Sequence, residues 1–176
     1  MTLHTDSITD YQWASDLWND SGRDRVVNYS IVGEVGHGSV GISKQEAGFI
    51  RSVFNQIDEL TGLTFQETDH VNADITTVSV ARYEDPRVLG LAVSSPEHQR
   101  MFSTWADEAG SYLTPNEAET IMHEIGHAVG LSHPHGNGFA PGISEHNTIM
   151  SYNETGAFVG YSATDIAALQ SLWGVG

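Results

Sequence analysis

The chain has 176 residues, enough for one domain with a core of ordinary depth. It has 23 acidic against 7 basic residues and a formal net charge of −16, so it lacks the basic surface that nucleic acids and anionic membranes require. No run of residues approaches the ~18 apolar positions of a bilayer-spanning helix, and the absence of cysteine excludes disulfides, thiol catalysis and cysteine-bound zinc. We therefore expect one domain, residues 1–176, that binds neither nucleic acid nor membrane. No pattern indicates a coiled coil, and we expect a monomer.

The first part of the chain predicts alternating helices and strands. A short helix is expected within residues 6–19, followed by a strand rich in β-branched residues within 25–35. Ser43 with Glu46 three residues later forms a capping box, and apolar residues at helical spacing then predict a helix up to Gly62. Further strands are expected at residues 63–65, 74–81, 88–93 and 101–105.

The second part of the chain begins with a well-marked helix. Thr114 suits the N-cap, Pro115 the first turn and Glu117 the third position of a capping box. We expect this helix to run to Gly130 and, after an irregular stretch, a final helix over residues 162–174. The order of elements predicts an α+β fold in which helices pack against a mixed sheet.

The segment from His123 to His133 has the spacing of a metal site. A helix turns about 100° per residue, so His123 and His127 lie within ~40° of each other, one turn apart, and both imidazoles can reach one ion. Gly130 permits the left-handed conformation that ends a helix and reverses the chain. That reversal would bring His133 back as the third ligand. Three neutral nitrogen ligands with an open fourth position are typical of catalytic zinc.

Glu124 stands beside the face that holds the ligands. It is too close in sequence to be an easy third ligand, but it is well placed to contact a water on the metal. Zinc lowers the pKa of bound water from ~15.7 to ~7, and Glu124 would take the proton and pass it to the departing amine. A histidine pair at this spacing is often a surface accident. Here apolar neighbours indicate a buried helix, and burying three histidines and a glutamate without a metal would be costly.

The pattern HExxHxxGxxH, from His123 to His133, resembles the signature of the metzincin zinc metallopeptidases. Metzincins also have a tight turn with a methionine below the ligands, and Thr-Ile-Met-Ser-Tyr at residues 148–152 resembles that turn. By this resemblance Met150 forms the floor under the imidazoles and is not a ligand. Pro134 after the third histidine, Tyr152 and the last helix are most similar to the catalytic domain of serralysins. The resemblance implies that Tyr152 is a switchable fifth zinc ligand that helps to stabilise the oxyanion.

The resemblance also implies an architecture and a mode of substrate binding. A twisted mixed sheet with an antiparallel edge strand is expected above the active helix, within an N-terminal part of residues 1–133. A smaller C-terminal part, residues 134–176, is expected to contain the methionine turn and the last helix. A polypeptide substrate is expected to bind extended along the edge strand, which residues 88–93 or 101–105 would supply. Phe139, in a glycine-rich stretch, is expected in the cleft wall.

Several expectations depart from the serralysin pattern or leave alternatives open. Calcium is a second candidate cofactor, but no motif indicates it. The glycine/aspartate nonapeptide of calcium-binding β-rolls is absent from the sequence. The resemblance implies a secreted enzyme, but the polar first residues show no signal peptide, and a cytosolic protein stays open. His135 and His146 are expected in loops beside the site.

Two other functions compete with a serralysin-like endopeptidase. One is a non-catalytic, zinc-stabilised binding module, against which Glu124 and Tyr152 count because such a module needs no general base. The other is a peptidase with one narrow protein target, which would share the chemistry of the site.

Overall fold

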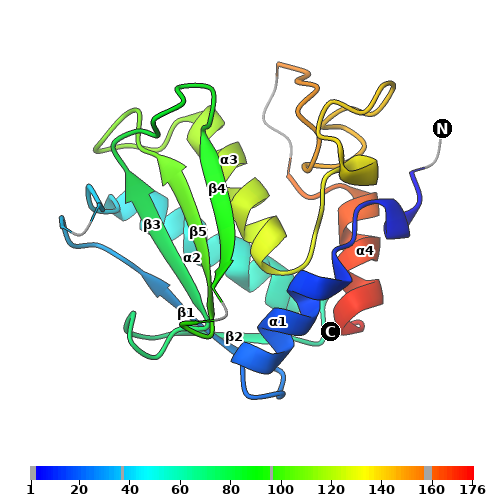
Figure 1. Ribbon diagram of the computed structural model, residues 1–176, viewed down its shortest axis with the longest axis horizontal. Helices are drawn as coiled ribbons and strands as arrows, with labels where there is room; N and C mark the ends of the chain where they lie inside the picture. Colours follow the sequence, from blue (N-terminus) through cyan, green and yellow to red (C-terminus); the bar gives the residue numbers. More distant parts are fainter. Residues whose placement is uncertain (1–2, 37, 96, 157–159) are drawn as a thin grey trace.

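The computed structural model describes residues 3–36, 38–95, 97–156 and 160–176 (Figure 1). Its five-stranded mixed sheet with helices packed against it confirms the expected α+β class. The strands are β1 (Val26–Ile31), β2 (Thr64–Glu67), β3 (Ile75–Val80), β4 (Gly90–Ser95) and β5 (Arg100–Ala106). The helices are η1 (Thr5–Ser7), α1 (Tyr11–Asp20), α2 (Lys44–Leu60), α3 (Pro115–Ala128), η2 (Pro134–Gly136) and α4 (Ala163–Trp173). In these ranges no helix combines the length and apolar character needed to cross a membrane.

The sheet has the order β2-β1-β3-β5-β4, and β4 is its antiparallel edge strand. The pairs β1–β2, β1–β3 and β3–β5 are parallel. Of the two segments expected at the edge, β4 therefore lies there, and the alternative assignment to residues 101–105 is wrong. The physical reason is that β5 has a strand partner on each side and buries Met101, Ser103 and Trp105 on one face, whereas β4 has one strand partner and leaves Leu91 and Val93 exposed.

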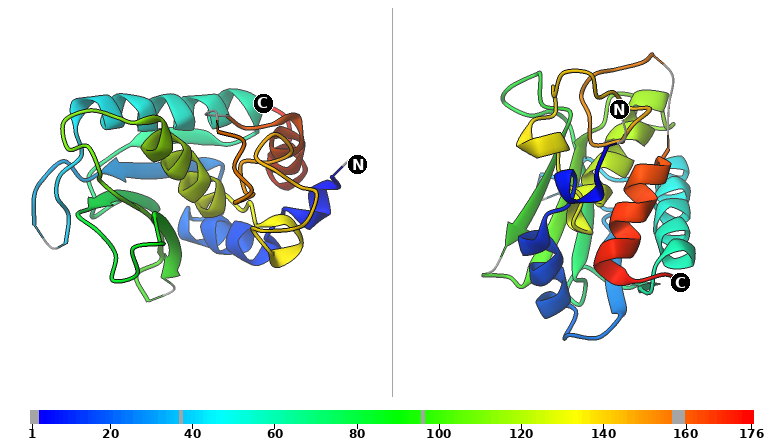
Figure 2. Two further views of the ribbon diagram at one scale, coloured as in Figure 1. Left: turned by 90° about the horizontal axis from the view of Figure 1, so that it is seen from above. Right: turned by 90° about the vertical axis from the view of Figure 1, so that its right-hand side faces the viewer.

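Helices α2 and α3 cover one face of the sheet and lie behind it in Figure 1. Both begin with complete capping boxes, at Ser43 and Thr114, as the sequence predicts. α2 buries Ile50, Phe54 and Ile57 toward the core. The view from above in Figure 2 shows α3 between α2 and the N-terminal helix α1. This position buries α3 on several sides, and its polar side chains must find partners or a ligand there.

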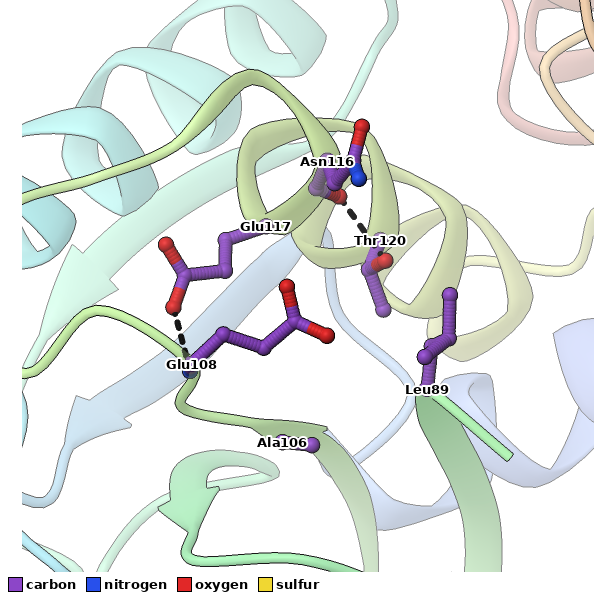
Figure 3. A pocket seen from close by; sticks show the side chains of 6 residues that line it. All are labelled: Leu89, Ala106, Glu108, Asn116, Glu117 and Thr120. Atoms are coloured by element: carbon purple, nitrogen blue, oxygen red, sulfur yellow. Dashed lines mark hydrogen bonds between the residues drawn. The ribbon is translucent and has the colours of Figure 1, made fainter. Parts of the chain in front are cut away.

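The glutamates of the two capping boxes also join the helices to the sheet. Glu46 Oε1 accepts a hydrogen bond of 2.9 Å from Trp105 Nε1 of β5. Glu117 Oε1 accepts bonds from the backbone N–H groups of Glu108 (2.7 Å) and Ala109 (3.1 Å), the first of which is drawn in Figure 3. Burial acts to raise the pKa of Glu117, but these N–H groups and those of the cap outweigh it and lower the pKa. The start of α3 is thus held firmly beside the end of β5.

The C-terminal helix α4 packs against the same core as the sheet. Trp173 Nε1 donates to the carbonyl of Val129 (2.8 Å), and Tyr161 Oη donates to the carbonyl of Met122 (3.0 Å). One apolar cluster of buried residues runs from Ile8 near the N-terminus through the sheet to Trp173. The turn that follows α3 is consequently packed between α1 and α4.

Candidate active site

Three imidazoles converge at the end of α3. Nε2 of His133 lies 3.2 Å from Nε2 of His123 and 3.2 Å from Nε2 of His127. Tetrahedral ligands at ~2.0–2.1 Å from zinc are separated by about 3.3 Å, so the three nitrogens fit the first coordination shell of that ion. The structure therefore brings together the three histidines that the sequence predicts as ligands.

Backbone carbonyls orient two of these rings. Nδ1 of His123 lies 2.8 Å from the carbonyl oxygen of Ile149, and Nδ1 of His127 lies 2.9 Å from that of Leu131. In the tautomer with the proton on Nδ1, the Nδ1–H group donates to the carbonyl oxygen. The lone pair of Nε2 is then free to bind a metal. Burial lowers the pKa of His123 to about 3 and that of His127 to about 4, so both rings are neutral at physiological pH. Burial also lowers the pKa of His133.

The reversal that returns His133 to the helix depends on Gly130. Its φ is +98°, in the region that side chains with a Cβ rarely adopt. A Cβ here would also lie 3.0 Å from Ala14 Cβ of α1 and 3.0 Å from Leu172 Cδ1 of α4. The structural role expected for Gly130 thus has two causes, backbone conformation and close packing.

Trp13 of α1 is a contact of the site that sequence analysis did not anticipate. Its ring lies 5.6 Å from that of His127. It belongs to a short N-terminal helix with no motif of its own, so only the packing of α1 beside α3 could show this contact.

Glu124 projects from α3 toward the edge strand. Its side chain is 6% exposed, and burial raises its pKa to about 8, with the backbone N–H of Ala92 acting in the opposite direction. Gly90 at the start of β4 makes this position possible, because a Cβ there would lie 2.5 Å from Glu124 Oε1. Sequence analysis missed Gly90. The available signal was a glycine within a strand, which often marks the close approach of another group.

Met150 packs against α3, the helix that carries His123 and His127. Its side chain is fully buried, and a Cβ on Gly126 of α3 would lie 3.1 Å from its sulfur. Gly126 stands between His123 and His127 in sequence, so the methionine packs against the turn of α3 that carries both histidines. The sulfur is therefore a packing partner of α3.

The ring of Tyr152 lies beside the histidines. Its centroid is 4.6 Å from that of His133 and 5.4 Å from that of His123, and 43% of the residue is exposed. Gly138 holds the backbone here by accepting a 2.7 Å bond from Tyr152 N–H, and a Cβ on Gly138 would overlap the tyrosine ring. Phe139 packs against the same ring at 5.2 Å. Gly138 is a second positioning glycine that the sequence did not reveal.

A cavity of about 650 Å³ opens in front of these groups. It is bounded by the start of β4, one face of α3 and the loop of residues 139–156, and its lining includes His123, Glu124, Tyr152 and Phe139. Burial and the charge of Glu124 raise the pKa of Tyr152, so its hydroxyl keeps its proton at neutral pH. His135 and His146 are exposed and do not belong to the described lining or to the histidine cluster.

Comparison with known protein families matches residues 40–134 to the reprolysin-like metallopeptidases of family M12B. The match covers more than half of the chain and includes all three histidines and Glu124. The chain belongs to this family. It is accordingly a zinc-dependent peptidase of the metzincin type, and the histidine cluster provides three donors suited to zinc.

The reprolysin-like chain is also similar in fold to solved structures, of which 85 chains match. One is described as the structure of myroilysin, with a TM-score of 0.53 and 13% identity over 84% of this chain and 92% of that one. At this identity the likeness concerns the fold alone. The comparison with curated proteins found no match. The predicted closeness to serralysins stays a prediction, and calcium stays a second candidate cofactor that no motif indicates.

Proposed function

We propose that this reprolysin-like metallopeptidase is a serralysin-like endopeptidase, with zinc held by His123, His127 and His133 and with Glu124 as general base. The observation that supports this most directly is the ligand geometry, because three Nε2 atoms meet at zinc-like separations beside a buried carboxylate. The cavity of about 650 Å³ in front of them gives a polypeptide access to both.

Zinc bound there supplies a Lewis acid that polarises the scissile carbonyl and acidifies water. Glu124 accepts the proton of the attacking water and returns it to the amine nitrogen that leaves. Burial alone strengthens the affinity of this carboxyl for a proton, and a zinc ion held by the three histidines would lower its pKa again and keep it ionised for this role. The packing against Gly90 limits its freedom and so keeps it beside the metal ligands.

Tyr152 is proposed as the donor that stabilises the oxyanion of the tetrahedral intermediate, and as a fifth zinc ligand in the resting enzyme. Its ring already contacts those of His123 and His133, and the hydroxyl stays protonated at neutral pH. Met150 and Gly130 act on the same site only through the position of α3 and of the turn after it.

The polypeptide is proposed to bind extended along the outer edge of β4. In the described sheet this strand has β5 as its one strand neighbour, and a peptide added at its other edge could receive main-chain hydrogen bonds. Leu89 and Gly90 line the cavity beside Glu124, so a peptide paired with β4 would pass in front of the general base. Secretion and a monomeric state remain predictions from family resemblance and composition.

The test compares the zinc-loaded protein with Glu124→Gln on an unfolded protein substrate. We expect the parent to cleave internal bonds and the variant to lose about 10²–10⁴-fold in kcat, with one zinc still bound. Glu59→Gln, an exposed glutamate on α2, serves as the matched control and should keep full activity. Zinc binding without cleavage by the parent would contradict the endopeptidase and support the zinc-stabilised binding module. Cleavage of one folded protein but of no unfolded one would support a narrow target.

A further inference from the structure

The cavity continues from the catalytic groups into a strongly acidic end. Glu119 of α3 and Glu145 and Glu154 of the following loop line this end, which we call the acidic pocket. Glu119 precedes His123 by one helical turn, so it lies about 6 Å along the same face of α3. The acidic pocket is therefore adjacent to the place where the scissile bond must lie, and within reach of a neighbouring side chain.

Glu145 of this pocket is buried and Glu119 is partly buried, both without a cation, whereas Glu154 is exposed. Glu145 is 6% exposed, and its Oε2 accepts only the neutral N–H and hydroxyl of Thr155, at 2.8 and 3.2 Å. Oε1 of Glu119 is completely buried and has no hydrogen-bond donor within the described part of the chain. A buried carboxylate oxygen without a donor is costly. Burial, the neighbouring carboxyl of Glu145 and the charge of Glu154 together raise the pKa of Glu119 to about 7.

The basic side chain of the cavity wall does not neutralise this pocket. Among the described residues that line the cavity, Arg87 is the one arginine or lysine. Its guanidinium is engaged by Asp85, with Nε 3.0 Å from Oδ1 and Nη2 2.7 Å from Oδ2. The excess negative charge must therefore be balanced by protons or by a ligand that enters from outside.

The spacing of the carboxylates favours a cationic side chain over a metal ion as that ligand. A divalent cation needs several oxygens converging at ~2.0–2.6 Å from one point. The described residues contain two groups of metal-ligand type with that convergence, the three histidines and Glu46–Asp107–Glu117, and the acidic pocket is not among them. An ammonium or guanidinium group on a flexible stem can instead hydrogen-bond to carboxylates that lie apart.

We propose that the acidic pocket binds a lysine or arginine side chain of the substrate next to the scissile bond, so that the enzyme selects basic residues there. This inference rests on the proposed endopeptidase activity and specifies its substrate class. The bound cation provides Glu119 with the donor that it lacks and pairs with the buried carboxylate of Glu145. Glu119 and Glu145 are thereby specificity-determining residues, outside the set of metal ligands and the general base.

The test uses two fluorogenic peptides that are identical except for a lysine or an acetyl-lysine beside the cleaved bond. Cleavage sites are first mapped on an unfolded protein by mass spectrometry, which also shows on which side of the bond the basic residue stands. We expect the parent to cleave the lysine peptide with at least about tenfold higher kcat/KM. In Glu119→Gln/Glu145→Gln the ratio of the two values should fall close to one, while the control Glu59→Gln keeps the ratio of the parent.

Each outcome separates this inference from the proposed function. If the parent cleaves no peptide, the endopeptidase proposal fails first. If it cleaves both peptides equally, the enzyme is a peptidase but the inference about the acidic pocket is overturned. Calcium that binds the parent, abolishes the lysine preference and no longer binds the double variant would assign the pocket to a metal and overturn the inference as well. The single variants Glu119→Gln and Glu145→Gln, each checked for folding and zinc content, provide the ratio if the double variant is unstable.

Discussion

The two walls of the active-site cleft are built in different ways. On one side, α3 and the turn after it place His123, His127 and His133 through a capping box, the helical period and one glycine. On the other side, residues 137–156 and 160–161 contain no helix or strand. This loop is held to α4 by the carboxylate of Asp165, which accepts hydrogen bonds from the Thr148 hydroxyl and from the N–H groups of residues 149 and 162.

This difference separates the functions of the two walls. The regular wall provides the metal ligands and the general base, whose relative positions follow from one helix and from the tight turn at Gly130. The irregular wall provides Met150, Tyr152 and Glu145, whose positions depend on buried polar contacts between residues far apart in sequence. Zinc binding should therefore tolerate change in the loop, whereas transition-state stabilisation and specificity should depend on it. The following substitutions test this division.

The largest effect is expected from Gly90→Ala, which tests whether the position of Glu124 on α3 also depends on strand β4. The added methyl would lie 2.5 Å from Glu124 Oε1 and 2.6 Å from Thr120 Cγ2, so Glu124 must leave its position. We expect kcat to fall about 10²–10³-fold with zinc still bound, because general bases contribute roughly that much. Kinetics and metal analysis provide the measurement. Gly48→Ala, on the exposed side of α2 with no atom within 4 Å, should leave kcat unchanged. Full activity of Gly90→Ala would show that β4 does not position the general base.

Asp165→Asn tests the irregular wall directly. The buried carboxylate accepts from three donors, and an amide group would turn an N–H toward at least one of them. We expect the free energy of unfolding to fall by about 3 kcal/mol in urea titrations. Zinc affinity should fall only about tenfold, since the bond from His123 to the carbonyl of Ile149 is loosened but the ligands remain. A loss of stability below ~1 kcal/mol would mean that other contacts hold the loop.

Gly138→Ala affects the loop without touching α3. Its Cβ would overlap the ring of Tyr152, which must turn away from His123 and His133. We expect kcat to fall about tenfold with an unchanged zinc content, and Tyr152→Phe to show a loss of the same size or larger. A combined variant should lose no more than Tyr152→Phe alone. If Gly138→Ala lowers kcat further in the background of Tyr152→Phe, the glycine acts through a different contact.

The smallest effect is expected from Asp20→Asn, which lies outside both walls. Burial and the charges of Asp16 and Asp74 raise the pKa of Asp20 to about 6, and the residue ends α1, where the helix dipole disfavours an anion. Since the folded pKa lies above the unfolded value of ~3.9, the stability associated with the protonated form is present below pH ~4 and is lost as the pH rises through about 6.

The asparagine variant removes this loss. After allowance for solvent screening of a half-buried group, we expect it to be more stable than the parent by about 1 kcal/mol at pH ~8 and equally stable at pH ~4. Thermal or urea unfolding at the two pH values measures the difference, and kcat at the higher pH should not change. A gain that is the same at both pH values would exclude the charge as its cause.

Much of the fold and of the metal centre is predictable from the sequence. The capping boxes at Ser43 and Thr114, the histidine spacing and Gly130 are all local features: the structure has both capping boxes, a cluster of the three histidines and a positive φ at Gly130. They are predictable because helical geometry relates residues three or four positions apart, whatever the rest of the chain does.

The tertiary structure alone decided the remaining features. Strand order, and with it the choice of β4 as the edge, depends on pairing between segments distant in sequence. Gly90 faces Glu124, Gly138 faces Tyr152, and Glu119 meets Glu145 across the cleft. No local period relates these pairs, because each contact forms only when the core has brought two separate segments within a few ångströms. The residues of the metal site are therefore predictable from one short segment of the sequence, whereas the shape and charge of the cleft depend on the packing of the whole domain.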